Sequence, residues 1–350
     1  MLTSADLATA SAVRRTADLD TVRVREFLVS IPLTPERSLR ARVFPPVRSR
    51  RAVLVVSGLN PAGIDEPRLV ALARQLSASK VTVVTPDIPE LAAFDISPAL
   101  TDAIERSAAW LASREDLAPD RRVGIIGISF SGGLSVVAAG RPSLAGKVAY
   151  VFALGGHHDL PRVLAYLSMG AGTTTGRPPH EYGAAVVLLG IADRVVPPEQ
   201  VEPLRIAVRR FLRASPLTRL DRPRAEDEFA ALRALAAEMP EPSATLLKFV
   251  DDRDVAQLGP RLLPHLGGYG DEPSLSPSRS PKPSAPVFLL HGIEDNVIPS
   301  SESEYLAQDL ERHVPVRLLL TGLISHAEIV DVRVQDVMRL AAFSADLLNR

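Results

Sequence analysis

The chain has 350 residues, with 40 Lys and Arg against 41 Asp and Glu, so its formal net charge is −1. A balanced charge creates no field that would attract nucleic acid or an anionic membrane surface, and we expect neither as a partner. The sequence contains no cysteine, which excludes a disulfide framework, thiolate catalysis and cysteine-bound metals. A chain of this length can bury a large core and can carry an insertion beside its main domain.

No apolar run reaches the ~18 residues that a membrane span requires. The longest runs, Val148 to Leu154 and Ala184 to Ala192, are far shorter. Residues 1–20 do not have the pattern of a signal peptide, because Arg14 and Arg15 are followed by no apolar stretch. The sequence therefore predicts a cytoplasmic protein without a membrane span.

Strand patterns dominate the first part of the chain. Val22 to Ile31 and Leu39 to Phe44 alternate apolar and polar residues, which predicts an antiparallel hairpin. Continuous apolar runs follow, typical of strands buried on both faces. They are Ala52 to Val56, Val81 to Val84, Val123 to Ile126 and Val148 to Leu154. Helical patterns separate these runs, so we predict an α/β fold with a mostly parallel central sheet and helices on both faces.

The alternation of strands and helices stops at Gly155. The segment that follows carries helical stripes, such as Leu204 to Leu212 and Phe229 to Met239. We expect these stripes to be helix-packing faces, and some of them could also form an acyl pocket. A proline- and serine-rich tract, Pro273 to Pro286, closes the segment and is typical of an exposed linker.

Strand patterns resume at Val287 to Leu290 and at Val316 to Leu320, and an amphipathic helix is expected from Ala327 to Leu348. The simplest organisation is one α/β core with a helical insertion. Residues 1–154 would form the first part of the core, 155–285 the helical cap with its linker, and 286–350 the second part of the core.

A candidate nucleophile follows the strand Val123 to Ile126, in the stretch Gly127-Ile128-Ser129-Phe130-Ser131-Gly132-Gly133. A serine on a tight strand-to-helix turn has an exposed hydroxyl beside a helix N-terminus, which favours developing negative charge. Small residues two positions to either side, here Gly127 and Ser131, keep such a turn free of clashes. Ser131 fits the same spacing and remains an alternative, but Ser129 directly follows the strand and is preferred.

A nucleophilic serine needs a base, and the base needs an orienting acid. Asp295 follows the strand that ends at Leu290, and His326 follows the next strand. The carboxyl ends of parallel strands share one edge of a sheet, so both residues would lie at the same edge as Ser129. Glu294 and Asp193 are the alternatives to Asp295.

These residues, in this order, resemble the α/β-hydrolase superfamily, above all its dienelactone hydrolase and prolyl-oligopeptidase-like branches. The resemblance covers residues 22–154 and 286–350, and it implies a cap insertion after the sixth strand. It implies Ser129 as nucleophile, His326 as general base and acid, and Asp295 as the residue that orients His326. It also implies an oxyanion hole made by the backbone N–H groups of Phe130 and Leu59.

Three further polar residues are expected to line the substrate cleft. Asn60 lies in the loop after the strand Ala52 to Val56, and His157 and His158 follow the strand Val148 to Leu154. His157-His158-Asp159 does not have the spacing of a zinc site, so we expect no metal. The glycines match no phosphate-binding pattern, so no cofactor is expected either.

The predicted function is therefore a serine hydrolase that cleaves a carboxylic ester, or a related acyl bond, of a small-molecule substrate. An acyltransferase or a peptidase could use the same residues. A binding protein that has kept the fold without the activity is the third possibility.

Overall fold

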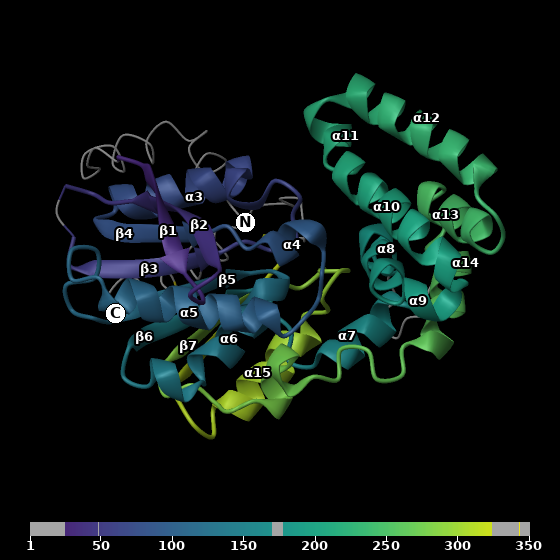
Figure 1. Ribbon diagram of the computed structural model, residues 1–350. Helices are drawn as coiled ribbons and strands as arrows, with labels where there is room; N and C mark the ends of the chain where they lie inside the picture. Colours follow the sequence, from purple (N-terminus) through teal and green to yellow (C-terminus); the bar gives the residue numbers. More distant parts are fainter. Residues whose placement is uncertain (1–24, 48, 170–177, 324–342, 344–350) are drawn as a thin grey trace. The chain divides into compact units, whose positions relative to one another are not determined.

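The structure is a computed structural model, and it describes residues 25–47, 49–169, 178–323 and 343. The chain divides into two compact units (Figure 1). The first unit contains residues 1–92, 97–159 and 272–350, and the second contains residues 93–96 and 160–271.

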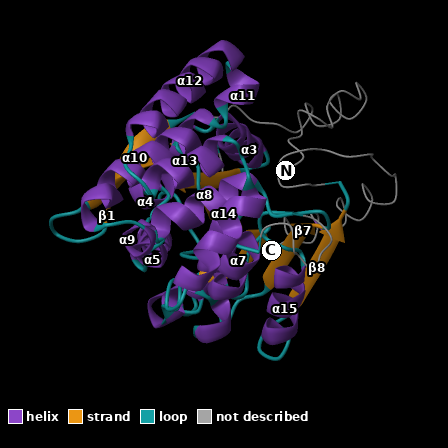
Figure 2. Ribbon diagram, turned by 90° about the vertical axis from the view of Figure 1, so that its right-hand side faces the viewer, coloured by secondary structure: helices purple, strands orange, loops and turns teal. Residues whose placement is uncertain are grey.

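The first unit is built on a sheet, whose strands are orange in Figure 2. Within the described residues the sheet has eight strands. Their order is β1-β2-β4-β3-β5-β6-β7-β8. The strands are β1 (Phe27–Pro32), β2 (Ser38–Phe44), β3 (Arg51–Val56), β4 (Val81–Pro86), β5 (Val123–Ile128), β6 (Val148–Leu154), β7 (Val287–Gly292) and β8 (Val316–Thr321). β1 and β2 form an antiparallel hairpin, and every pair from β4 to β8 is parallel. The predicted hairpin and mostly parallel sheet are confirmed.

Burial on both faces explains why the sequences of the central strands are continuous apolar runs. All residues of β4 and β7 are buried, as are those of β3 after its first residue. A strand covered on both faces cannot alternate apolar and polar residues without burying unpaired polar groups. The helices of this unit follow the strands in sequence: α3 (Pro67–Ala78), α4 (Pro89–Ala93), which ends in the second unit, α5 (Ala99–Ser113), α6 (Phe130–Ala139) and α15 (Ser301–Leu310).

The second unit follows β6, so the helical insertion comes after the sixth strand. Its described elements are helices: α7 (Leu160–Leu167), α8 (Glu181–Gly190), α9 (Ala192–Val195), α10 (Pro198–Ala214), α11 (Leu217–Leu220), α12 (Arg222–Glu238), α13 (Ser243–Asp251) and α14 (Val255–Leu262). α8 is apolar on all sides, and it packs against α10, α13 and α14. A helix without a polar face belongs in the centre of a helical unit, which accounts for the apolar run Ala184 to Ala192.

The tract 273–286 differs from the exposed linker that its composition predicts. Leu275 is only 2% exposed. Thr101 Oγ1 donates a hydrogen bond to the carbonyl of Ser274 (2.7 Å), and His157 Nε2 donates one to the carbonyl of Leu275 (2.7 Å). A proline-rich backbone still offers its carbonyl groups, and buried donors of the first unit use them. The tract therefore packs with the first unit, and the second unit ends at Asp271 rather than near residue 285.

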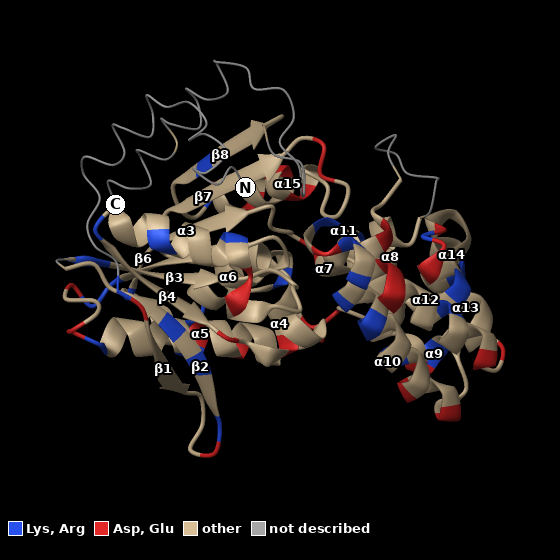
Figure 3. Cartoon of the chain, turned by 90° about the horizontal axis from the view of Figure 1, so that it is seen from above, with Lys and Arg blue, Asp and Glu red and all other residues tan. Residues whose placement is uncertain are grey.

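Charged residues occur along both units, with Lys and Arg interspersed among Asp and Glu (Figure 3). This distribution agrees with the balanced charge of the sequence. None of the described helices combines the length and the apolar character that crossing a membrane would require.

Candidate active site

Ser129 lies at the turn between β5 and α6. Its backbone has φ 54° and ψ −128°, a conformation that costs a residue with a side chain about 1–3 kcal/mol. The hydroxyl does not cap α6, so Ser129 is not an ordinary N-cap serine. Its N–H donates to the Leu154 carbonyl (2.6 Å), and its carbonyl accepts from the Gly132 N–H (2.8 Å). The turn is held on both sides and presents a hydroxyl that the helix does not use.

Small residues on either side of Ser129 make this turn possible. A Cβ placed on Gly127 would lie 2.2 Å from the carbonyl oxygen of Ser131, so only glycine fits there. Ser131 has no exposed surface, and its hydroxyl donates to the carbonyl of Ser57 (2.5 Å). Ser131 thus joins α6 to the loop after β3, and its hydroxyl is not accessible to a substrate.

The loop after β3 passes directly against Ser129. A Cβ placed on Gly58 would lie 3.2 Å from Ser129 Cβ and 3.8 Å from Ser129 Oγ. Leu59 follows Gly58, so the two backbone segments expected to supply N–H donors, at Leu59 and Phe130, both adjoin Ser129. Asn60 Oδ1 accepts a hydrogen bond from the N–H of Ala62 (2.9 Å). The side chain of Asn60 therefore shapes this loop.

Asp295 lies in the turn after β7, and its side chain is only 4% exposed. Its Oδ1 accepts hydrogen bonds from the N–H groups of Val297 (2.8 Å) and Ile298 (3.0 Å). Gly155, the first residue after β6, lies between Asp295 and Ser129. A Cβ on Gly155 would be 3.6 Å from Asp295 Oδ2 and 3.9 Å from Ser129 Cα. The structure thus brings the candidate nucleophile and the candidate acid to the same edge of the sheet.

His326, the candidate base, lies outside the described residues. The strand that leads toward it is described. β8 is parallel to β7, and Thr321 at its carboxyl end pairs with Gly292 at the end of β7. The chain therefore leaves β8 at the edge that holds Asp295, only a few residues before His326.

His157 is fully buried and offers no surface to a substrate. Its ring stacks on the ring of Phe130, with centroids 5.1 Å apart and planes 11° from parallel. Nε2 donates to the carbonyl of Leu275, while Nδ1 is buried without a hydrogen-bond partner. Burial lowers the pKa of His157, so the ring is held neutral. The expected role in lining the cleft does not fit this position, and His157 instead packs behind Phe130.

His158 is tied to the first unit by its side chain and its backbone. Its Nε2 contacts Asp309 Oδ2 at 3.1 Å, and Lys282 Nζ donates to the same oxygen at 2.5 Å. Burial acts to raise the pKa of Asp309, but the hydrogen bonds from Lys282 and His158 outweigh it and lower that pKa. The N–H groups of His158 and Asp159 donate to Glu302 Oε2, at 2.9 and 3.0 Å. These contacts fasten the chain just before it enters the second unit.

His157 and His158 have different partners and do not converge. Within the described ranges, no three His, Asp or Glu side chains are placed to hold a metal ion.

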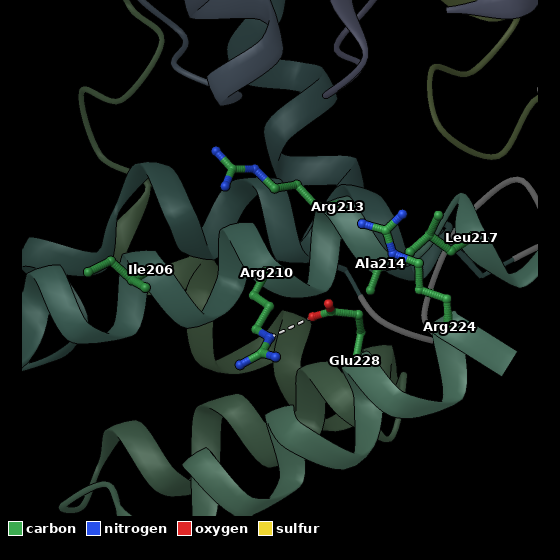
Figure 4. Close-up of a pocket in the computed structure, with 7 residues that line it drawn as sticks. All are labelled: Ile206, Arg210, Arg213, Ala214, Leu217, Arg224 and Glu228. Carbon is green, nitrogen blue, oxygen red and sulfur yellow. Dashed lines mark hydrogen bonds and ion pairs between the residues drawn. The ribbon is translucent and has the colours of Figure 1, made fainter. Parts of the chain in front are cut away.

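The second unit contains a hollow of about 400 Å³ (Figure 4). It is lined by Ile206, Arg210, Arg213, Ala214, Leu217, Arg224 and Glu228. Arg210 Nε donates to Glu228 Oε2 at 2.7 Å. A lining with three guanidinium groups differs from the mostly apolar pocket that an acyl chain would need. We therefore do not assign the hollow to the candidate site.

Three observations at the site were not predicted from the sequence: the close approach of Gly58 to Ser129, the position of Gly155 between Ser129 and Asp295, and the burial of His291 beside Asp295. The positive φ of Gly155, +67°, shows why a glycine stands there. His291 carried a signal in the sequence, because a histidine at the end of an apolar strand must find hydrogen-bond partners.

No family model and no curated protein sequence matches the chain. Solved structures are similar in fold. An esterase from the archaeon Pyrobaculum calidifontis has a TM-score of 0.50 and 16% identity over 97% of this chain and 91% of its own. Brefeldin A esterase, a bacterial homologue of human hormone-sensitive lipase, has a TM-score of 0.51 and 14% identity over 99% and 82%. The acylaminoacyl peptidase of Pyrococcus horikoshii has a TM-score of 0.51 and 13% identity over 94% of this chain.

The chain spans only 42% of the length of that peptidase. Identities this low establish similarity of fold and not of activity. The mostly parallel sheet of this chain and its likeness to these structures over nearly its whole length indicate the same fold. The chain has the α/β-hydrolase fold.

Proposed function

We propose that the chain is a serine hydrolase that cleaves a carboxylic ester or a related acyl bond, with Ser129 as its nucleophile. The environment of Ser129 carries this proposal. Its hydroxyl stands on a strained turn, against the loop of Gly58, with Asp295 on the far side of Gly155. Hydrolases of the same fold, two of them esterases and one a peptidase, support hydrolysis as the class of reaction.

In the first step, Ser129 Oγ attacks the carbonyl carbon of the substrate, and His326 takes the hydroxyl proton. Asp295 orients His326 and stabilises its protonated form. The carbonyl oxygen becomes negatively charged and accepts hydrogen bonds from the N–H groups of Phe130 and Leu59. The N-terminus of α6 adds a favourable field for that charge.

In the second step, the bond between the carbonyl carbon and the leaving oxygen breaks. The alcohol departs with the proton that His326 held, and the acyl group stays on Ser129 as an ester. A water molecule then gives a proton to His326 and attacks this ester. Release of the carboxylic acid returns the proton to Ser129, so the cycle needs no cofactor.

Turnover of short p-nitrophenyl esters tests the proposal. Ser129→Ala should lower kcat/KM by at least ~10³-fold, because the variant lacks the hydroxyl on which the acyl-enzyme forms. Ser131→Ala is the matched control, since it removes a neighbouring hydroxyl that is buried and hydrogen-bonded to Ser57. Activity that is unchanged in Ser129→Ala would rule the nucleophile out.

A second experiment identifies the leaving group of the substrate and the molecule that accepts the acyl group. The likeness to an acylaminoacyl peptidase favours a comparison of an N-acylated aminoacyl ester with the matching anilide. An esterase cleaves the ester alone at a useful rate, whereas a peptidase cleaves both. Adding an alcohol or a thiol then separates the classes further, because an acyltransferase diverts the acyl group from water to that nucleophile.

A further inference from the structure

We propose that His291 is the residue that positions Asp295, an inference that rests on the proposed function of the Asp295 carboxylate. His291 lies in β7, four residues before Asp295, and it has no exposed surface. It is not part of the Ser129, His326 and Asp295 set. Its role is read from the contacts of its two ring nitrogens.

Both ring nitrogens of His291 have partners. Nε2 lies 2.8 Å from the carbonyl oxygen of Ile298, and Nδ1 lies 2.6 Å from Ser303 Oγ in α15. A carbonyl oxygen can only accept a hydrogen bond, so Nε2 carries a proton. In the neutral ring Nδ1 is then an acceptor and takes its hydrogen bond from the Ser303 hydroxyl. These two contacts fix both the tautomer and the orientation of the ring.

The contact with Ile298 closes the turn that carries Asp295. The N–H of Ile298 donates to Asp295 Oδ1, and the carbonyl of the same residue accepts from His291. At the other end of the turn, the N–H of Ile293 donates to the carbonyl of Thr321 in β8 (3.0 Å). Ile298 is 2% exposed, so water cannot replace His291 as the partner of its carbonyl.

These contacts determine which carboxylate oxygen of Asp295 is directed toward Ser129. Oδ1 is held by the N–H groups of Val297 and Ile298. Oδ2 lies 3.4 Å from His291 Nε2 and points toward Gly155, the side on which Ser129 lies. Oδ2 is therefore the oxygen that would orient His326. A shift of about 1 Å in a group of this kind can cost ~10²-fold in rate.

Two substitutions distinguish the roles of the two ring nitrogens of His291. His291→Gln keeps an N–H donor near the position of Nε2, and His291→Asn keeps polar atoms only near Nδ1. We expect His291→Asn to lose about 10–100-fold in kcat on a short p-nitrophenyl ester, with KM changed by less than about threefold. His291→Gln should stay within about fivefold of the wild-type kcat. Ser303→Ala is the matched control: it removes the partner of Nδ1 and leaves the contact of Nε2 with Ile298, so its kcat should also stay within about fivefold of the wild type.

The pH dependence of kcat/KM provides a second measurement, which would not change if His291 only stabilised the fold. A correctly placed carboxylate favours the protonated form of the base beside it. When Asp295 is displaced, as expected in His291→Asn, the acidic limb of kcat/KM should move to lower pH. In His291→Gln the limb should stay where it is in the wild type.

Equal losses in the Asn and Gln variants would overturn the proposal, as would a loss confined to KM. A measurement on the wild-type protein covers the case in which a variant does not fold. Two-bond ¹H–¹⁵N spectra of the protein labelled at its histidines should show His291 with its proton on Nε2, and a proton on Nδ1 alone would refute the assignment. If Ser129→Ala is inactive while His291→Asn equals the wild type, only the positioning role fails. If Ser129→Ala is active, the proposed function itself fails.

Discussion

Replacing Ser129 by glycine should make the protein more stable than replacing it by alanine, although both variants should be inactive. Ser129 has φ 54°, in a region that residues with a Cβ atom avoid. Alanine keeps the Cβ and therefore keeps the strain, whereas glycine adopts this backbone without cost. The comparison isolates the backbone, because neither residue has a hydroxyl.

The size of the effect follows from two opposing contributions. Strain at such a position is worth about 1–3 kcal/mol. Glycine gains extra freedom in the unfolded chain, which costs the folded state about 0.5–1 kcal/mol. With both contributions at the middle of their ranges, the glycine variant is more stable by about 1 kcal/mol, and the limits are about 0 and 2.5 kcal/mol. The preference for glycine over alanine at a helix N-cap acts in the same direction, and the loss of a partly buried methyl group acts against it.

Urea denaturation followed by tryptophan fluorescence measures this difference. The sequence has a single tryptophan, Trp110, which lies in α5 of the first unit, the unit that also holds Ser129. Its emission therefore reports the unfolding of the unit that contains the substitution. A glycine variant that is less stable than the alanine variant would show that Ser129 does not carry backbone strain.

Three other substitutions test the surroundings of the site by the same assay. Ser131→Ala should lower the free energy of unfolding by about 1–2 kcal/mol, because the buried carbonyl of Ser57 loses its hydrogen-bond donor. An unchanged free energy of unfolding would show that this hydrogen bond does not stabilise the fold. Gly132→Ala should lower the free energy of unfolding by about 1–3 kcal/mol, since a Cβ would lie 2.8 Å from Gly156 Cα. A variant as stable as the wild type would contradict this close approach. Burial lowers the pKa of His157, so below its unfolded pKa of about 6.5 the unfolded chain binds a proton that the folded chain does not. The free energy of unfolding should therefore fall as pH drops below about 6.5, by up to ~1.4 kcal/mol per pH unit. His157→Phe should remove this contribution to the pH dependence. A variant with the same pH dependence as the wild type would refute the burial of a neutral ring.

Local patterns predicted most of the sheet. Runs such as Val81 to Val84 can only be strands or buried helices, and their short length and β-branched residues favoured strands. The turn at Ser129 was predicted for the same reason, since small residues and a preceding strand are local features. The order of Ser129 and Asp295 along the chain then placed both at one edge of the sheet.

Contacts between distant segments were not predictable in this way. Pro273 to Pro286 has the composition of an exposed tract, but the carbonyls of Ser274 and Leu275 are acceptors for Thr101 and His157. No local pattern indicates that pairing. His157 and His158 are adjacent in sequence and were given one role, whereas the first is buried behind Phe130 and the second contacts Asp309. Side-chain direction in an irregular loop depends on partners far away in the sequence.

Mapping a covalent adduct tests the nucleophile most directly. No Lys or Arg occurs between Arg122 and Arg141, so Ser129 and Ser131 share one tryptic peptide, and its fragmentation must assign the modified residue. After treatment with a fluorophosphonate, we expect one adduct per chain, on Ser129, that is absent from Ser129→Ala and present in Ser131→Ala. A wild-type protein that remains unlabelled, or an adduct that persists in Ser129→Ala, would contradict the assignment of Ser129.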